Sequence, residues 1–168
     1  TSEIIFIAAG QAYVVYAESV IGDENGNSLI ECGELISLDL AMENVGEVEA
    51  IGVNTLLISD NEWIVLGDTE EEYGDIMVGE SVMKEDAFSF TVADNVPDQT
   101  ILEFEIESND GVSFWYSEFE FTANAPSLES ELIGIDDTEF GNANHMLDAG
   151  ETALLSWQVL NSGHSIAA

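Results

Sequence analysis

The chain has 168 residues, of which 35 are Asp or Glu and one, Lys84, is Lys or Arg, so its formal net charge is −34. A surface this acidic repels phosphate backbones and anionic lipid headgroups, which excludes nucleic-acid binding and polybasic attachment to membranes. Hydrophobic residues make up 46% of the chain, enough for a packed core, and no apolar run is long enough for direct membrane insertion. The charge favours cations and a saline or calcium-rich exterior, with most carboxylates keeping the surface solvated.

Short runs of alternating apolar and polar residues, separated by Gly, Asn and Asp clusters, predict strands and no helix. The predicted strands are residues 3–8, 12–17, 35–43, 50–58, 62–66, 86–93, 100–107, 112–122, 128–135 and 152–160. Seven of them fit between residues 12 and 122, and seven is the strand count of an immunoglobulin-like sandwich. Trp157 alternates with Leu155 and Val159 and is expected to face a core.

Two stretches of the chain match each other at a separation of 117 residues. The matched pairs are Gly33-Glu34 with Gly150-Glu151, Leu38 with Leu155, Leu40 with Trp157, Met42 with Val159, and Asn44-Val45-Gly46 with Asn161-Ser162-Gly163. Near the N-terminus, Ser2, Glu3, Phe6 and Ala8 match Ser117, Glu118, Phe121 and Ala123 at a separation of 115. Repetition of this kind is typical of a modular array.

The strand pattern and the repetition together predict an all-β protein of immunoglobulin-like antiparallel β-sandwich modules in tandem. Residues 1–8 are the expected last strand of a preceding repeat. Residues 9–125 form the complete repeat, and residues 126–168 are the first part of the next.

The loop at residues 23–34 has the side chains of a calcium site. With Asp23 as position one, oxygen donors fall at positions one, three, five, seven, nine and twelve, the spacing of a twelve-residue calcium loop. The donors are Asp23, Asn25, Asn27, the Leu29 carbonyl, Glu31 and Glu34. Gly26 stands at position four instead of six and the flanks read as strands, so the expected setting is a strand-to-strand loop and not an EF-hand. The alternative is an Asx-rich turn whose side chains satisfy backbone donors.

The second copy of this loop keeps most of the donors and predicts a second Ca²⁺ site. The donors that it keeps are Asn142, Asn144, Asp148 and Glu151. Position one falls on Phe140, so the first carboxylate has to come from Asp136 or Asp137 across a longer loop. His145 lies inside the loop and is expected to be solvated.

The order Asp-x-Asn-x-Asn, Gly-Glu, alternating strand and Asn-x-Gly resembles the immunoglobulin-like repeats of secreted bacterial and archaeal surface proteins. Among these repeats, the pattern is similar to that of the cell-adhesion-related domain found in bacteria (CARDB-like repeats). In that family Asn-x-Gly marks the turn after the second strand, which corresponds to Asn44-Val45-Gly46 and Asn161-Ser162-Gly163. Similar modules accompany gingipain-like peptidases and other large exported proteins, so the resemblance implies an extracellular or cell-surface location.

No catalytic motif stands out, because Cys32, His145 and His164 are isolated and carboxylate pairs are too common to single one out. We therefore predict a non-enzymatic structural or adhesive module of an extracellular surface protein, fibre or coat, stiffened by calcium, with neighbouring copies of the module or subunit as partners. One alternative is an accessory domain of a large secreted peptidase or glycosidase. Another is a self-assembling extracellular filament whose subunits complete each other by strand addition. A protein or glycan partner at the surface is left open.

Overall fold

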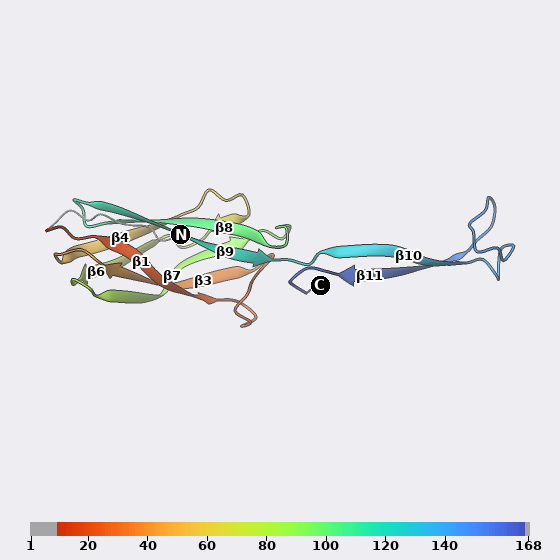
Figure 1. Ribbon diagram of the computed structural model, residues 1–168, viewed down its shortest axis with the longest axis horizontal. Helices are drawn as coiled ribbons and strands as arrows, with labels where there is room; N and C mark the ends of the chain where they lie inside the picture. Colours follow the sequence, from red (N-terminus) through yellow and green to blue (C-terminus); the bar gives the residue numbers. More distant parts are fainter. Residues whose placement is uncertain (1–9, 167–168) are drawn as a thin grey trace. The chain divides into compact units, whose positions relative to one another are not determined.

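The computed structural model describes residues 10–166, so the predicted strand at residues 3–8 lies outside the described part. Every regular element in residues 10–166 is a strand, and none is a helix (Figure 1). A helix long and apolar enough to cross a membrane is accordingly not found among these residues. The chain divides into two compact units, Thr1–Asn124 and Ala125–Ala168, called unit 1 and unit 2 below.

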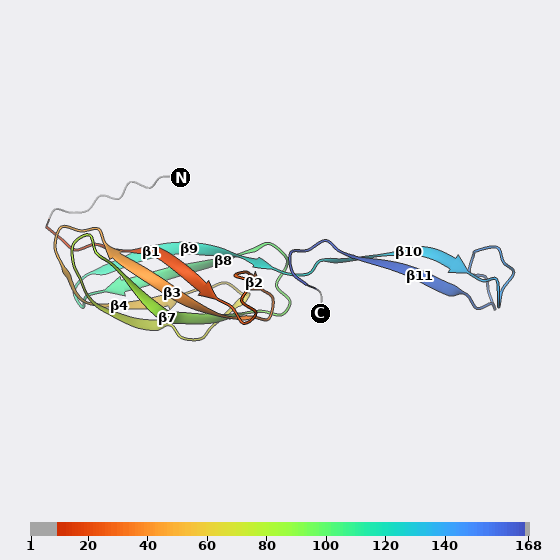
Figure 2. The ribbon, with the colours of Figure 1, turned by 90° about the horizontal axis from the view of Figure 1, so that it is seen from below.

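Unit 1 contains two sheets in its described residues. The four-stranded sheet has the order β1-β3-β7-β5, and the five-stranded sheet has the order β2-β9-β8-β4-β6 (Figure 2). The strands are β1 (Val14–Gly22), β2 (Ile30–Glu31), β3 (Leu35–Asn44), β4 (Ala50–Ile58), β5 (Ile64–Leu66), β6 (Glu70–Ile76), β7 (Ser81–Val92), β8 (Thr100–Asn109) and β9 (Phe114–Asn124). Paired strands run antiparallel except β2 and β9, which pair in parallel and make the second sheet mixed.

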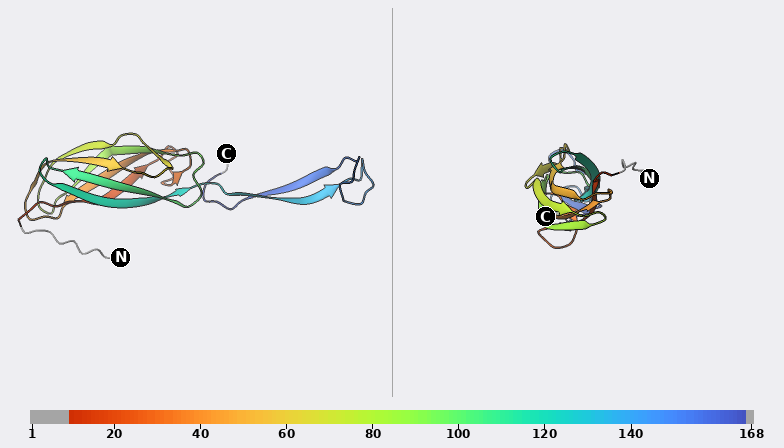
Figure 3. Two further views of the ribbon diagram at one scale, coloured as in Figure 1. Left: turned by 90° about the horizontal axis from the view of Figure 1, so that it is seen from above. Right: turned by 90° about the vertical axis from the view of Figure 1, so that its left-hand side faces the viewer.

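The inward faces of the two sheets share one core. Alternate residues of the long strands are buried, as the period of two in a half-buried strand requires; they include Ile36, Leu38, Leu40, Met42, Phe88, Phe90, Leu102, Phe104 and Ile106. The rings of Phe90 and Phe104 come from different sheets, and their centroids are 4.8 Å apart. The Tyr73 hydroxyl of β6 donates to the Leu40 carbonyl of β3 at 2.7 Å. These contacts join the two layers seen in Figure 3.

The strand count of unit 1 corrects the sequence prediction, since nine strands lie between residues 14 and 124 where seven were predicted. β6 was missed because it begins with three consecutive Glu residues, although Tyr73 and Ile76 face the core. β7 begins at residue 81 and not 86, because its pairing with β3 extends to Ser81 through an irregularity at which Asp86 adopts a left-handed φ of 50°. The parallel pairing of β2, a strand of two residues, also departs from the predicted antiparallel arrangement.

Unit 2 consists of an antiparallel pair, β10 (Leu128–Asp136) and β11 (Leu154–Asn161), joined by a long loop. Trp157 is 57% exposed, so the prediction that it faces a core is wrong for the part of unit 2 that the structure describes. Its counterpart Leu40 is fully buried in unit 1 beneath the second sheet. Within residues 125–166 no second sheet covers the hairpin.

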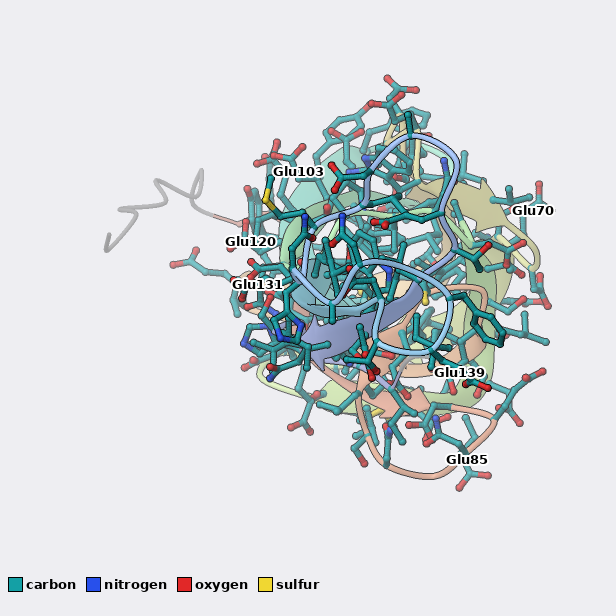
Figure 4. All side chains as sticks on the ribbon, turned by 90° about the vertical axis from the view of Figure 1, so that its right-hand side faces the viewer. Glu70, Glu85, Glu103, Glu120, Glu131 and Glu139 are labelled. Carbon is teal, nitrogen blue, oxygen red and sulfur yellow. The ribbon has the colours of Figure 1, made fainter. Side chains whose placement is uncertain are left out.

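The outer face of the five-stranded sheet carries glutamates that lie opposite one another. Glu103 pairs with Glu120, and Glu105 with Glu118, directly across β8 and β9. Figure 4 shows Glu70, Glu103 and Glu120 projecting from the surface. Like charges opposite one another destabilise a strand pair. The ion pair between Lys84 and Glu71, at 3.7 Å, involves none of these four glutamates and does not relieve the repulsion.

Candidate cation-binding loops

Loop 1, residues 23–34, connects β1 to β3, and polar side chains within it donate hydrogen bonds to Glu31. The side-chain amides of Asn25 and Asn27 both donate to Glu31 Oε2, at 2.7 and 2.8 Å. Their Oδ1 atoms accept the backbone N–H groups of Asn27 and Leu29, at 3.0 and 2.7 Å. The Asx turns named as an alternative are therefore present in loop 1.

Two further carboxylates lie beneath these turns. Glu34 is 7% exposed, and its Oε2 accepts the backbone N–H of Glu31 at 3.3 Å. Burial raises the pKa of Glu34; hydrogen bonding to the backbone of Glu31 opposes the rise, and the charges of Asp23 and Glu31 add to it. Asp23 Oδ2 is buried without a hydrogen-bond partner. Buried negative charge of this kind is costly unless a cation or a hydrogen-bond donor compensates it.

Loop 2, residues 137–151, repeats these hydrogen bonds. The side-chain amides of Asn142 and Asn144 donate to Asp148 Oδ2 at 2.9 and 2.8 Å. Their Oδ1 atoms accept the backbone N–H groups of Asn144 and Met146, at 3.0 and 2.7 Å. The backbone N–H of Asp148 donates to Glu151 Oε1 at 2.7 Å. Asp148 and Glu151 thus occupy the positions of the two glutamates at the end of loop 1.

Of the two candidates for the first carboxylate of loop 2, the structure brings Asp137 into the loop. Asp137 is fully buried and accepts the backbone N–H groups of Asn144 and His145, at 3.0 and 3.1 Å. Burial opposes its ionisation, but these N–H groups prevail and its pKa lies below the usual range. Asp136 instead accepts the backbone N–H and the hydroxyl of Thr138, at 3.0 and 2.6 Å. Asp137 is therefore the candidate that contributes a buried carboxylate to loop 2.

The donor set fits a hard cation only if amide and carbonyl oxygens contribute. Residues 10–166 contain no group of three or more His, Cys, Asp or Glu side chains that could hold a metal ion. In loop 1, Asp23 and Glu34 lie close enough for their charges to interact, and the remaining oxygens would have to come from Asn25, Asn27 and the Leu29 carbonyl. Ca²⁺ accepts such mixed oxygen donors, whereas zinc prefers nitrogen and sulfur.

Loop 1 is also attached to the last residue of unit 1. Ile30 and Glu31 pair in parallel with Ala123 and Asn124. The Cys32 N–H donates to the Asn124 carbonyl at 3.1 Å, and the Asn124 amide donates to the Ile30 carbonyl at 3.3 Å. Because these hydrogen bonds join loop 1 to the end of β9, conformational order in one of the two segments is linked to order in the other.

The Asn-x-Gly motif has a structural role that the sequence pattern alone does not reveal. Asn44 is fully buried, and its Oδ1 accepts the N–H groups of Tyr13 and Gly46, at 3.2 and 3.0 Å. Its amide donates to the Val48 carbonyl at 2.8 Å and to the Ile76 carbonyl, in the other sheet, at 3.0 Å. A Cβ on Gly46 would lie 2.4 Å from Tyr13 N, so only glycine fits. The indication of this role in the sequence was that the Asn-x-Gly motif occurs twice.

Asn161 repeats this arrangement in unit 2. Its Oδ1 accepts the N–H groups of Ser127 and Gly163, both at 3.0 Å, and its amide donates to the Ser165 carbonyl at 2.8 Å. A Cβ on Gly163 would lie 2.3 Å from Ser127 N. The two motifs therefore share three hydrogen bonds and one close backbone approach.

No protein-family model matches this chain, and no curated protein matches it. The two loops and the surfaces of the two units are therefore the features that bear on function.

Glu34→Gln is expected to raise the melting temperature in calcium-free buffer at neutral pH, because it removes a buried charge. The pKa of Glu34 is raised in the folded state. Its ionisation therefore costs stability above that pKa, and the cost disappears as the pH falls through it toward the unfolded-state value. The advantage of the variant over wild type should shrink along the same pH interval. Calcium-free melts of both proteins from pH 7 to about 4, near the unfolded-state pKa of glutamate, measure this difference. A constant advantage at every pH would contradict the assignment.

Proposed function

We propose that this protein is a non-catalytic structural or adhesive module of an extracellular surface protein, fibre or coat. Its two packed sheets form an immunoglobulin-like sandwich, and Ca²⁺ bound in loop 1 stiffens it. The observation that carries the proposal is the buried, unpartnered Oδ2 of Asp23 beside the buried Glu34 carboxylate. A calcium ion would neutralise this charge with oxygen ligands from the same loop.

The stiffening would act through β2. Loop 1 contains this strand, and β2 pairs with Ala123 and Asn124 at the end of β9. A cation that orders loop 1 would order this pairing as well, and with it the backbone that leads into Ala125. In an array of such modules, calcium would then rigidify each module and the segment that follows it.

The second loop supports the same function in a second module. Its hydrogen bonds onto Asp148 and Glu151 match those of loop 1 onto Glu31 and Glu34. Asp137 provides the remaining buried carboxylate. In this proposal residues 9–125 are one complete module, and residues 126–168 begin another with its own calcium site.

The charge supports an extracellular setting. A net charge of −34 with one basic residue opposes compaction by self-repulsion. Dissolved salt and divalent cations relieve that repulsion, and extracellular calcium modules commonly bind with dissociation constants of about 10⁻⁴–10⁻³ M. Neighbouring copies of the module are the partners that this proposal assigns.

Isothermal titration of the full chain with CaCl₂ tests the proposal. High, fixed ionic strength is needed so that general screening is matched. We expect saturable binding at loops 1 and 2, and we expect Asp23→Asn to abolish the loop 1 component. Glu24→Gln removes one charge from the exposed side of the same loop and should keep both components. No saturable binding, or equal losses in the two variants, would overturn the calcium assignment.

A further inference from the structure

Loop 1 contains the Asn-Gly dipeptide of this chain, Asn25-Gly26, and loop 2 has Asn142-Ala143 at the matching positions. All four residues are exposed. An asparagine loses its side-chain amide most readily when glycine follows it. The backbone nitrogen of the next residue attacks the side-chain amide carbon, and glycine has no Cβ to hinder that attack. The two loops therefore differ at the position that controls this reaction.

The hydrogen bonds of the two asparagines are the same in both loops. In each loop the asparagine Oδ1 accepts the backbone N–H two residues later, at 3.0 Å. The side-chain amide donates to the acidic residue six positions later, which is Glu31 or Asp148, at 2.7 and 2.9 Å. An N–H group that donates to Oδ1 stabilises the negative charge that develops on this oxygen during the attack. Asn25 and Asn142 are therefore equally activated by their surroundings.

The attacking nitrogen is also presented in the same way in both loops. Gly26 and Ala143 have left-handed φ angles of 72° and 60°. Among residues 10–166, neither of their backbone N–H groups donates a hydrogen bond. A Cβ on Gly26 would have no heavy atom within 4 Å, so no packed neighbour restrains this residue. The methyl group of Ala143 is then the difference that remains between the two sites.

We propose that Asn25 is a site of spontaneous deamidation, which converts loop 1 to a more acidic form with a higher affinity for calcium. The Gly26 nitrogen forms a bond to Asn25 Cγ, the Cγ–Nδ2 bond breaks, and ammonia leaves with the proton of the Gly26 N–H. Water then opens the cyclic imide at one of its two carbonyls, which gives aspartate or its β-linked isomer. The reactants are the chain itself and water.

The new carboxylate changes what loop 1 requires. The Asn25 amide now donates to Glu31 Oε2. A carboxylate at residue 25 cannot donate, so without a cation this hydrogen bond is lost and two negative charges face each other. With Ca²⁺ bound, the same carboxylate adds a charged oxygen at the third position of the loop, and the number of charged ligands tunes the affinity of such loops. This effect rests on the calcium site proposed above, whereas the deamidation does not.

Mass spectrometry of the full chain during incubation at mildly alkaline pH tests the modification. Cleavage after glutamate, at acidic pH where deamidation is slow, releases residues 25–31 and 140–151 as separate peptides. Fragment ions distinguish Asn25 from Asn27. We expect deamidation at Asn25 to be at least about tenfold faster than at Asn142, because the barrier lacks the contribution of a hindering methyl group. Equal rates at the two residues would overturn the proposal.

Exchange of the following residues provides the matched control. Gly26→Ala should slow deamidation at Asn25 to the rate of Asn142 in the wild type. Ala143→Gly should accelerate deamidation at Asn142 to the rate of Asn25. Ala143 itself shows that alanine adopts the left-handed φ of this position, so both variants fit the loop backbone. Rates that do not follow the glycine would contradict the proposed attack.

Asn25→Asp reproduces the aspartate product and tests the effect on calcium. Titration with CaCl₂ at high, fixed ionic strength should give a roughly tenfold lower dissociation constant for loop 1 than in freshly purified wild type. Ser28→Asp adds the same charge at an exposed position outside the donor set and should change the constant much less. Equal effects of the two variants, or none, would overturn the gain in affinity. A wild type that binds no calcium would overturn the proposed function together with this gain, and the rates at Asn25 and Asn142 would still decide the modification.

Discussion

Asn44→Ala is expected to lower the free energy of unfolding by about 3–5 kcal/mol, a large fraction of the stability of a small domain. The side chain makes four hydrogen bonds while fully buried. Its removal leaves the N–H groups of Tyr13 and Gly46 and the carbonyls of Val48 and Ile76 without this partner. An unsatisfied buried group costs about 1–3 kcal/mol, and local relaxation recovers part of the sum.

Urea unfolding followed by Trp fluorescence measures the loss, because Trp115 is 5% exposed in unit 1. Asn161→Ala is the matched control, since it removes the same motif from unit 2, where the surroundings are exposed. Water can replace hydrogen bonds there, so we expect a loss below about 1 kcal/mol. Similar losses in the two variants would show that burial of Asn44 is not the source of the effect.

Calcium is expected to raise the melting temperature of unit 1 by about 5–10 °C. A ligand that binds only the folded state at 10 to 100 times its dissociation constant adds about 1.4–2.7 kcal/mol. A domain of this size gains roughly 4 °C per kcal/mol. Thermal melts of the full chain in calcium and in chelator, at equal high ionic strength, measure the shift.

Glu34→Ala should abolish the calcium-dependent shift, because it removes the terminal buried carboxylate of loop 1. Glu24→Ala removes the same charge from an exposed position of the loop and should retain the shift. Magnesium at equal ionic strength controls for screening, and it dehydrates too reluctantly to fill a flexible oxygen cage. If magnesium produces the same shift, or if Glu34→Ala retains it, calcium acts by general charge screening and not by binding in loop 1.

Asn44 and loop 1 lie at opposite ends of the hairpin formed by β1 and β3. Asn44 fastens the end of β3 to the chain before β1 and to β6, while loop 1 joins the other ends of these strands to β9. Calcium and the buried asparagine are therefore expected to stabilise unit 1 independently. The losses in the free energy of unfolding caused by removing calcium and by Asn44→Ala should therefore add when the two changes are combined, because the two sites share no contact.

Local patterns in the sequence were enough to predict the strands with strong alternation and the two loops rich in Asn, Asp and Glu. Both depend on local spacing: Phe88, Phe90 and Val92 alternate along one strand, and Asp23 through Glu34 fall within twelve consecutive positions. The match between Gly33-Glu34 and Gly150-Glu151 could also be recognised in the sequence, because corresponding residues keep a constant separation.

Features that depend on neighbours distant in sequence could be recognised only in the folded chain. Asp137, and not Asp136, enters loop 2 because the folded loop turns the N–H groups of Asn144 and His145 toward it. Strand β6 is held by Tyr73 and Ile76 facing the core, although its sequence is mostly acidic. Trp157 has the alternation of a core residue and is exposed, because alternation defines a face, and burial requires a second sheet to cover it.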